Sequence, residues 1–219
     1  MSPTRTIPLC EPTLGEPEAQ AAQQVVRSGW IGTGGSAIET FEQRVAACCN
    51  APFAVATQSG TAALHLGMLD ANLPIGSEII APALTFIAPI NVIRYVQCVP
   101  LLVDVEPNHA QMDVPALEQK LARNTASQQG KLINKHTGRR ISAILAVHLL
   151  GHAVDIEPLR ELAQRYELKL IEDAAEALGV RYQDGPLFRG KATQCLSFNV
   201  NKIITTGGGG MVLCHDETT

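Results

Sequence analysis

The run Ser197-Phe-Asn-Val-Asn-Lys-Ile-Ile-Thr-Thr-Gly-Gly-Gly-Gly210 sets one lysine, Lys202, between a short apolar segment and four consecutive glycines. Leu196 and Phe198 are typical of the end of a buried strand, and the glycines predict tight turns that a Cβ would hinder. A lysine on such a turn would extend into a cleft. Burial favours the neutral amine, which can form a Schiff base with an aldehyde or ketone. The alternative is a solvated lysine beside a flexible loop.

The composition indicates a globular, well-buried chain. Its 219 residues suffice for one large domain or two small ones, and 46% are apolar against 17% charged. The net charge of −4 offers no basic surface to nucleic acid. No apolar run is long enough to span a membrane, and the N-terminal residues lack an apolar signal core. We therefore expect a cytoplasmic protein with neither nucleic-acid nor membrane partners.

The cysteines and histidines predict neither disulfides nor a metal site. None of the six cysteines belongs to a Cys-x-x-Cys pair, so we expect reduced thiols in the cytoplasm. His148 and His152 are four residues apart, which would suit metal binding on a helix. Gly151 and the apolar run before these histidines indicate a strand and a turn instead, and we expect no metal.

Strand and helix patterns alternate along the chain, after an irregular start over residues 1–15. We expect helices at 16–28, from 36, at 62–71, 85–95, 114–123 and after Asp155, and strands at 53–57, 78–81, 99–103, 141–147, 168–171, 195–198 and 210–214. Residues 124–140 are polar and basic, which predicts a surface loop. The last strand can follow its predecessor after a short turn, so it should be antiparallel. The pattern predicts an α/β/α fold with a mostly parallel sheet and one antiparallel strand.

Ligands of such sheets bind beyond the carboxyl ends of the strands. Gly60, Phe86, Asp173 and Ser197 all fall at strand ends of this kind. Ser59-Gly60-Thr61, between a strand and a helix, predicts a phosphate cradle, because the first N–H groups of the helix are unpaired and glycine allows an anion to approach. The alternative is an ordinary helix N-cap by Ser59 or Thr61.

These residue types are the ones that pyridoxal phosphate requires: a lysine, an acid for the ring nitrogen, an anion cradle and a flat apolar side chain. With them, the chain resembles the fold-type-I, pyridoxal-phosphate-dependent sugar aminotransferases of the DegT/StrS group over nearly its whole length. The resemblance rests on Gly29-Trp-Ile-Gly-Thr-Gly34, Ser59-Gly-Thr-Ala-Ala-Leu64, Pro82-Ala-Leu-Thr-Phe86, Val147-His-Leu-Leu-Gly151, Glu172-Asp-Ala-Ala-Glu176 and Ser197-Phe-Asn-Val-Asn-Lys202.

The resemblance implies a role for each matching residue. Lys202 would bear the cofactor as a Schiff base and later carry the transferred proton. Asp173 would pair with the protonated pyridine nitrogen, and Phe86 would stack on the ring. The phosphate would be held by Gly60, Thr61 and Ser197. Each has a plainer alternative: Asp173 could cap a following helix, Phe86 could be core, and Ser197 could be an ordinary strand residue.

The same resemblance gives Glu176 a place near the phenolic oxygen of the cofactor, where the family often has glutamine or histidine. We expect this carboxylate to share a proton with that oxygen; the alternative is a solvated helix residue. The loop with Trp30, Thr33 and Gly34 would contribute to the substrate site. His148 is more typical of a packed strand histidine and is not assigned a role.

The resemblance also implies a reaction. The lysine region and Thr137-Gly-Arg-Arg-Ile141 are similar to the branch that aminates nucleotide-linked 4-keto-6-deoxy sugars for legionaminic-type acids and other surface glycans, usually with glutamate as donor. Val200 departs from the glycine that is common there, which puts the shape of the loop in doubt. Lys202 favours transamination over the dehydration of related enzymes that have histidine in its place. The family works as dimers with sites at the interface.

We expect residues 1–35 to form a helix and a substrate or interface loop, and residues 36–219 to form the cofactor-binding large domain. The resemblance implies a smaller C-terminal domain after the glycine run, and we expect that domain to be missing from the present chain. Two functions follow: an aminotransferase dependent on Lys202, or a non-catalytic remnant that binds the cofactor or a partner without turnover. A dinucleotide-binding domain is a weaker third, because Gly207–Gly210 precedes a strand and does not open a helix.

Overall fold

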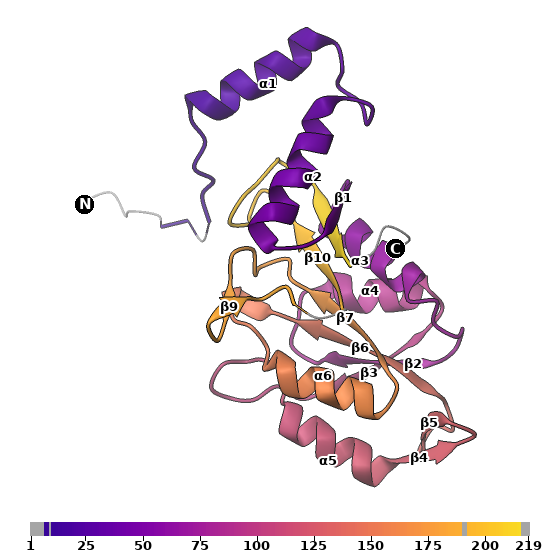
Figure 1. Ribbon diagram of the computed structural model, residues 1–219. Coiled ribbons are helices and arrows are strands. Elements are labelled where there is room, and N and C mark those ends of the chain that lie inside the picture. Colours follow the sequence, from indigo (N-terminus) through magenta and orange to yellow (C-terminus); the bar gives the residue numbers. More distant parts are fainter. Residues whose placement is uncertain (1–6, 9, 190–191, 216–219) are drawn as a thin grey trace, which may run out of the picture.

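The computed structural model describes residues 7–8, 10–189 and 192–215 and has the layered α/β/α architecture that the sequence predicts (Figure 1). A central sheet carries the site. Its seven strands are β1 (Phe53–Thr57), β2 (Glu78–Pro82), β3 (Val99–Val103), β6 (Ile141–Val147), β7 (Lys169–Asp173), β10 (Thr193–Ser197) and β11 (Gly210–Cys214). In space they follow the order β1-β11-β10-β7-β6-β2-β3.

One strand of this sheet runs against the others. The neighbours β10, β7, β6, β2 and β3 pair in parallel, whereas β11 is antiparallel to both β10 and β1. The expected single antiparallel strand is therefore confirmed. Because the remaining strands share one direction, their carboxyl ends gather at one edge of the sheet, as the sequence argument requires.

Helices cover both faces of the sheet. On one face lie α2 (Ser36–Cys49), α5 (Val114–Asn124) and α6 (Ile156–Arg165), and on the other lie α3 (Gly60–Asp70) and α4 (Ile87–Tyr95). Every residue of β6 is buried. Ile144 and Ala146 pack into the first layer, Ala143 and Leu145 into the second, which explains why this strand is a continuous apolar run.

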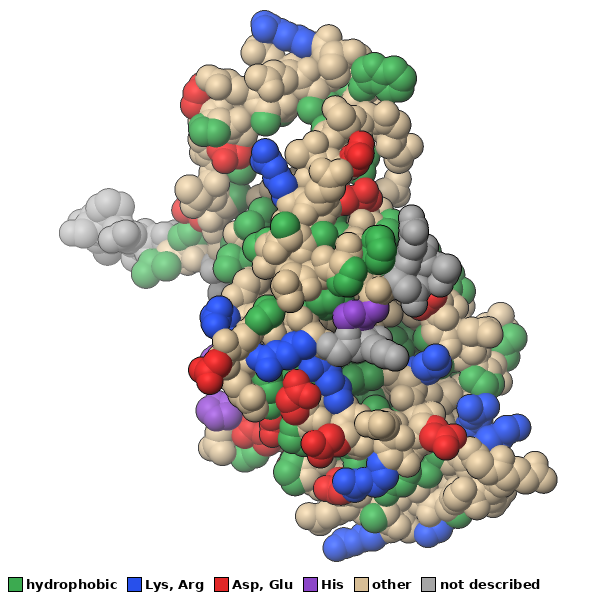
Figure 2. All heavy atoms as spheres, viewed as in Figure 1, with side chains coloured by type: hydrophobic (Ala, Val, Ile, Leu, Met, Phe, Trp, Pro, Cys, Tyr) green, Lys and Arg blue, Asp and Glu red, His purple; other side chains and the backbone are tan. Residues whose placement is uncertain are grey.

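The first helix, α1 (Glu16–Ser28), stands away from the layers, as Figures 1 and 2 show, and none of its residues is buried. Its limits are those that the sequence predicts. Pro17 lies in the first turn, and Gly29 ends the helix in the left-handed conformation, with φ of 75°. Residues 30–35 then form the expected loop to α2. Of the irregular start predicted for residues 1–15, residues 1–6 and 9 lie outside the described part of the chain.

The polar segment 124–140 is not a plain loop, so that prediction is wrong. It contains the hairpin β4 (Thr125–Gln128) and β5 (Lys131–Asn134), which pair antiparallel. Gln129 and Gly130 turn between them with φ of 51° and 72°, the left-handed pair that a two-residue hairpin needs. A second small hairpin, β8 (Arg181–Tyr182) with β9 (Gly185–Pro186), was also not predicted, whereas the 3₁₀ turn η1 (Leu149–Gly151) lies where the sequence indicates a turn.

Cys10, Cys48, Cys49, Cys98 and Cys195 are free thiols. Among the described residues, no cluster of three or more His, Cys, Asp or Glu side chains could hold a metal ion. No helix within the described ranges has the length and apolar character needed to cross a bilayer.

Candidate active site

A cavity of about 340 Å³ opens at the carboxyl edge of the sheet, a size within the range of small-molecule sites. Its walls come from segments far apart in the sequence. They include every residue that the sequence proposes for cofactor binding, namely Gly60, Thr61, Phe86, Asp173, Glu176, Ser197 and Lys202. The sheet topology thus brings these seven positions into one cavity.

The cradle between Gly60 and Ser197 has no room for a side chain at residue 60. A Cβ added to Gly60 would lie 2.7 Å from Ser197 Cβ, well inside contact distance. The hydroxyl of Ser59 accepts the N–H of Ala62 at 3.1 Å and so caps α3. The N-cap and the cradle are therefore the same structure. The cap uses one N–H group, and the other N–H groups of the first turn have no hydrogen-bond partner within the helix.

Lys202 follows β10, and its amine meets a carboxylate inside the cavity. Nζ donates to Glu176 Oε1 at 3.1 Å, and Glu176 Oε2 accepts the N–H of Leu150 at 2.8 Å. The side chains of Lys202 and Glu176 are only 12% and 32% exposed. The lysine is thus not a solvated surface residue. Glu176 lies in a turn and not on a helix, so its alternative also fails.

Asp173 ends β7 and is almost fully buried. Its Oδ1 accepts the N–H of Ala175 at 2.9 Å, while its other oxygen accepts no hydrogen bond in the described part of the chain. Burial raises the pKa of this carboxyl to about 6; the Ala175 N–H, His148 and Lys202 oppose the rise, and Glu176 adds to it. No helix follows, so Asp173 is not a helix cap. A buried carboxyl with one free oxygen is suited to pairing with a cationic N–H.

The neighbouring carboxylate of Glu172 is fully engaged. It accepts hydrogen bonds from Arg160 Nη2 at 3.0 Å, from His148 Nε2 at 3.1 Å and from the amide of Gln194. Burial alone would raise its pKa, but these three partners outweigh burial and hold the pKa below its usual range. His148 Nδ1 accepts the N–H of Val154, which fixes the neutral tautomer that donates from Nε2. Of the adjacent pair, only Asp173 is left for a ligand.

The predicted aromatic and substrate-loop residues have different surroundings. Phe86 is the N-cap residue of α4 and is 68% exposed, so it forms part of the cavity wall and is not core. Thr33 and Gly34 line a neighbouring groove that shares Gln58 with the main cavity. Trp30 is exposed and lines neither of the two.

Four further polar residues line the cavity, which sequence reasoning did not propose: Gln58, His148, Asn199 and Asn201. The two asparagines come one and three residues before Lys202, and this closeness in the sequence was the available signal. His148 is both a packed residue and a wall residue, since its ring is buried and hydrogen-bonded at both nitrogens. Nothing in the sequence distinguishes such a residue from core.

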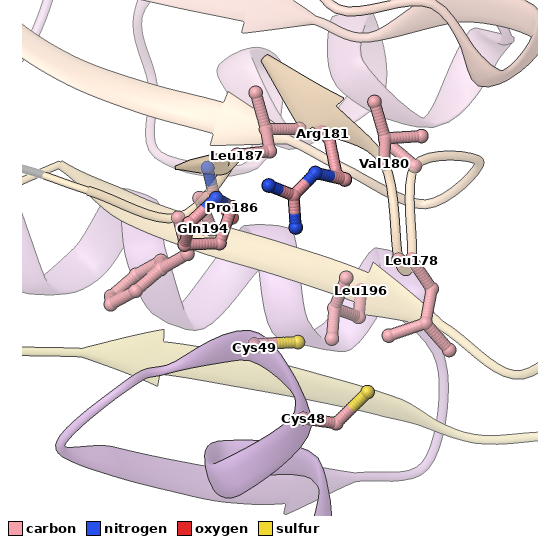
Figure 3. A pocket seen from close by; sticks show the side chains of 12 residues that line it. Cys48, Cys49, Leu178, Val180, Arg181, Pro186, Leu187, Gln194 and Leu196 are labelled. Carbon is pink, nitrogen blue, oxygen red and sulfur yellow. The ribbon is translucent and has the colours of Figure 1, made fainter. Parts of the chain in front are cut away.

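Another cavity, of about 280 Å³, lies between the end of α2 and the β8–β9 hairpin (Figure 3). Its labelled wall residues include Cys48, Cys49, Arg181 and Leu196, together with Gln194. Burial raises the pKa of the Cys49 thiol to about 11, and the neighbouring Cys48 adds to the rise. A neutral thiol is a poor nucleophile and a poor metal ligand. This cavity therefore lacks the reactive groups that meet around Lys202.

Comparison with known proteins agrees with this geometry. Residues 12–219 match the model of the DegT/DnrJ/EryC1/StrS aminotransferase family. The chain belongs to this family. It is 36% identical over 212 residues to GDP-perosamine synthase of Escherichia coli O157:H7. The aligned region covers 97% of this chain and 54% of that protein. It is 33% identical over 211 residues to UDP-4-amino-4-deoxy-L-arabinose–oxoglutarate aminotransferase of Shewanella sediminis, covering 96% and 50%.

The fold is shared with solved aminotransferases. A protein from Streptococcus pneumoniae assigned as a sugar aminotransferase, Spr1654, superposes in its PLP-form with a TM-score of 0.83 and 26% identity, covering 97% of this chain and 54% of that one. This chain spans about half the length of the curated relatives that it matches. The resemblance to the legionaminic branch in particular is not borne out by these comparisons, which support the family and its nucleotide-sugar aminotransferases.

Pyridoxal phosphate is the cofactor of this family, and the described residues fit it. The cradle at Gly60 would be filled by a Cβ, which suits an anion. The unpartnered oxygen of buried Asp173 suits a protonated ring nitrogen. The amine of Lys202 and the ring of Phe86 share the same cavity, so the four groups that the cofactor needs are present together.

Proposed function

We propose that this chain is the cofactor-binding part of an aminotransferase that aminates a nucleotide-linked 4-keto-6-deoxy sugar, with glutamate as amino donor, in surface glycan biosynthesis. The observation that carries the proposal is the amine of Lys202, which is held by Glu176 in the cavity that also contains buried Asp173. A plain binding domain has no need of a buried lysine beside a buried carboxyl that has one oxygen free for a ligand.

The residues of the cavity wall divide the binding of pyridoxal phosphate among them. Gly60, Thr61 and Ser197 would hold the phosphate, and Phe86 would cover the ring face. Asp173 would hold a proton on the ring nitrogen through its free oxygen, because an ionised carboxyl stabilises a neighbouring cation. Bound in this way, the cofactor would withdraw electrons from the carbon that bears the transferred amino group.

Lys202 and Glu176 would handle the proton that transamination moves. Lys202 Nζ would be the base that removes this proton from the donor carbon and the acid that later returns it. Glu176 Oε1 accepts a hydrogen bond from Nζ and would hold the amine at the cavity wall between these steps. The carboxylate would also share a proton with the phenolic oxygen.

The names of the relatives support the substrate class. One relative is a GDP-linked amino-sugar synthase, and the name of the other combines a UDP-linked 4-amino sugar with oxoglutarate, the keto partner of glutamate. A keto group at sugar carbon 4 is therefore the natural acceptor. We carry over neither the nucleotide nor the sugar of either relative.

We propose further that residues 36–219 act as the cofactor unit and that residues 1–35 serve the substrate and a subunit interface in a cytoplasmic homodimer. In support, α1 buries none of its residues against the sheet layers, and Thr33 and Gly34 line a groove next to the main cavity. The free thiols of Cys10, Cys48, Cys49, Cys98 and Cys195 agree with a reducing compartment.

The test is covalent trapping. We expect the purified chain to turn yellow with pyridoxal phosphate and, after borohydride reduction, to carry the cofactor on the peptide that contains Lys202. Lys202→Ala should abolish this adduct and lower transamination by at least about 10³-fold. A folded wild-type chain without an adduct on Lys202 would refute the proposal. An adduct without turnover would favour a non-catalytic remnant.

A further inference from the structure

Gln111 is a buried amide that binds both backbone groups of one residue beside the cavity. Its side chain oxygen accepts the N–H of Leu149 at 3.2 Å, and its nitrogen donates to the carbonyl of Leu149 at 3.0 Å. The nitrogen also donates to the carbonyl of His109 at 3.1 Å. Gln111 is only 5% exposed. A buried side chain that is satisfied in this way fixes the backbone that it grips.

The segment that carries Gln111 is closed on itself. Val105 and Met112 form an isolated antiparallel bridge, and the N–H of Glu106 donates to the carbonyl of Gln111 at 2.9 Å. The carboxylate of Glu106 accepts the N–H groups of Asn108 and His109, which ties down the turn between the two sides. Gln111 therefore projects from a fixed platform after β3.

Leu149 is followed by a residue in an unusual conformation. Leu150 has a φ of 55°, in the left-handed region, and its side chain is 72% exposed. Packing of the leucine side chain therefore does not explain the conformation. Its effect is to direct the N–H of Leu150 to Glu176 Oε2, at 2.8 Å. Unusual backbone of this kind persists when surrounding contacts determine it.

We propose that Gln111 is a positioning residue: by gripping Leu149, it holds the N–H of Leu150 on Glu176, and so fixes the carboxylate that meets Lys202. The effect on Lys202 and the cofactor rests on the proposed function. The fixing of Leu149 and Leu150 rests on the hydrogen bonds alone. Gln111 itself touches neither Lys202 nor Glu176.

The grip matters because Glu176 has several charged or titratable neighbours. Lys202 faces it from the turn after β10, Asp173 from the end of β7, and His148 lines the same cavity from the end of β6. A loosened Glu176 would change its distance from the lysine amine. The pH at which a cofactor bound at Lys202 gains its proton would change with this distance.

The first readout needs no cofactor. Gln111→Met keeps the size of the side chain and removes its hydrogen bonds. In the unliganded chain, we expect amide hydrogen exchange in residues 149–150 to accelerate roughly tenfold. The matched control is Asn134→Leu. It removes another buried side-chain amide, whose nitrogen donates a hydrogen bond to Glu78 at 2.7 Å, and it should leave the exchange rate of residues 149–150 unchanged. Equal exchange in wild type and Gln111→Met would overturn the inference.

The second readout is the pH midpoint of the absorbance of the cofactor-loaded chain. Gln111→Met should shift it in the same direction as Glu176→Gln, by about half as much. In the Glu176→Gln background it should add nothing, because both changes act through one carboxylate. Additive shifts, or no shift, would overturn the inference. If the wild type shows no cofactor absorbance, the proposed function fails, and the exchange comparison alone decides whether Gln111 positions Leu150.

Discussion

Lys202 Nζ lies 3.1 Å from Glu176 Oε1, although the two residues come from different loops at the edge of the sheet. The carboxylate is fixed from behind by the N–H of Leu150, so the amine has a partner whose place is set by the backbone. Both side chains are mostly buried. An ion pair that is shielded in this way interacts more strongly than one at the surface.

This pair predicts the effect of Glu176→Gln. The variant keeps the shape and the acceptor for Leu150 but removes the charge that favours a proton on the neighbouring groups. In the cofactor-loaded chain, we expect the absorbance midpoint to fall by about one pH unit. The control is Glu118→Gln, whose carboxylate pairs with Arg165 at an exposed site. A midpoint that does not move would argue against any electrostatic role for Glu176.

The cradle predicts the effect of Gly60→Ala. The new Cβ would lie 2.7 Å from Ser197 Cβ, so one segment must move and the space for the phosphate shrinks. We expect cofactor affinity to fall at least about tenfold, with a loss of stability of roughly 1–3 kcal/mol. Equilibrium binding of pyridoxal phosphate measures the first, and urea unfolding the second.

Gly32→Ala is the matched control for that experiment, because a Cβ at residue 32 meets no atom within 4 Å. It should leave both quantities close to wild type. Unchanged affinity in Gly60→Ala would mean that the first turn of α3 does not contact the phosphate.

Strong local patterns predicted most of the fold. The bounds of α1, β1, β3, β6 and β11 agree with the sequence prediction, because each has a clear apolar period or a glycine or proline at its limit. The hairpin of β4 and β5 was missed because its strands are mostly polar and show no apolar strand pattern. Only the turn at Gln129 and Gly130 indicated it. Asp155 is the N-cap residue of α6, but its carboxylate makes no capping hydrogen bond and instead accepts the hydroxyl of Tyr182, a long-range partner.

The cavity was predictable where a residue type alone carries the chemistry, as at Lys202. It was not predictable where a side chain acts through a neighbour. Glu172 and Asp173 are adjacent acids, and only the three-dimensional partners of Glu172 show which of the two is free. Gln111 likewise has an ordinary sequence context, and its grip on Leu149 depends on the folded loop.

Asp173 predicts a pH dependence of stability in the unliganded chain. Burial raises its pKa from 3.8 to about 6, so between pH 4 and 6 the folded chain binds more protons than the unfolded chain. The stabilisation by protonated Asp173 is fully present below about pH 4 and is lost as pH rises to 6. The total loss is about 3 kcal/mol, from a shift of roughly two pH units.

Asp173→Asn removes this titration and keeps the acceptor for the Ala175 N–H. Unfolding in urea should therefore show equal stability of both chains near pH 4, with the variant more stable by up to about 3 kcal/mol at pH 7. Other carboxyls cancel in the comparison. With pyridoxal phosphate the order should reverse, because a cationic ring nitrogen stabilises the ionised Asp173 of the wild type and gives the amide no such gain. A pH-independent difference in the unliganded chain would contradict the raised pKa.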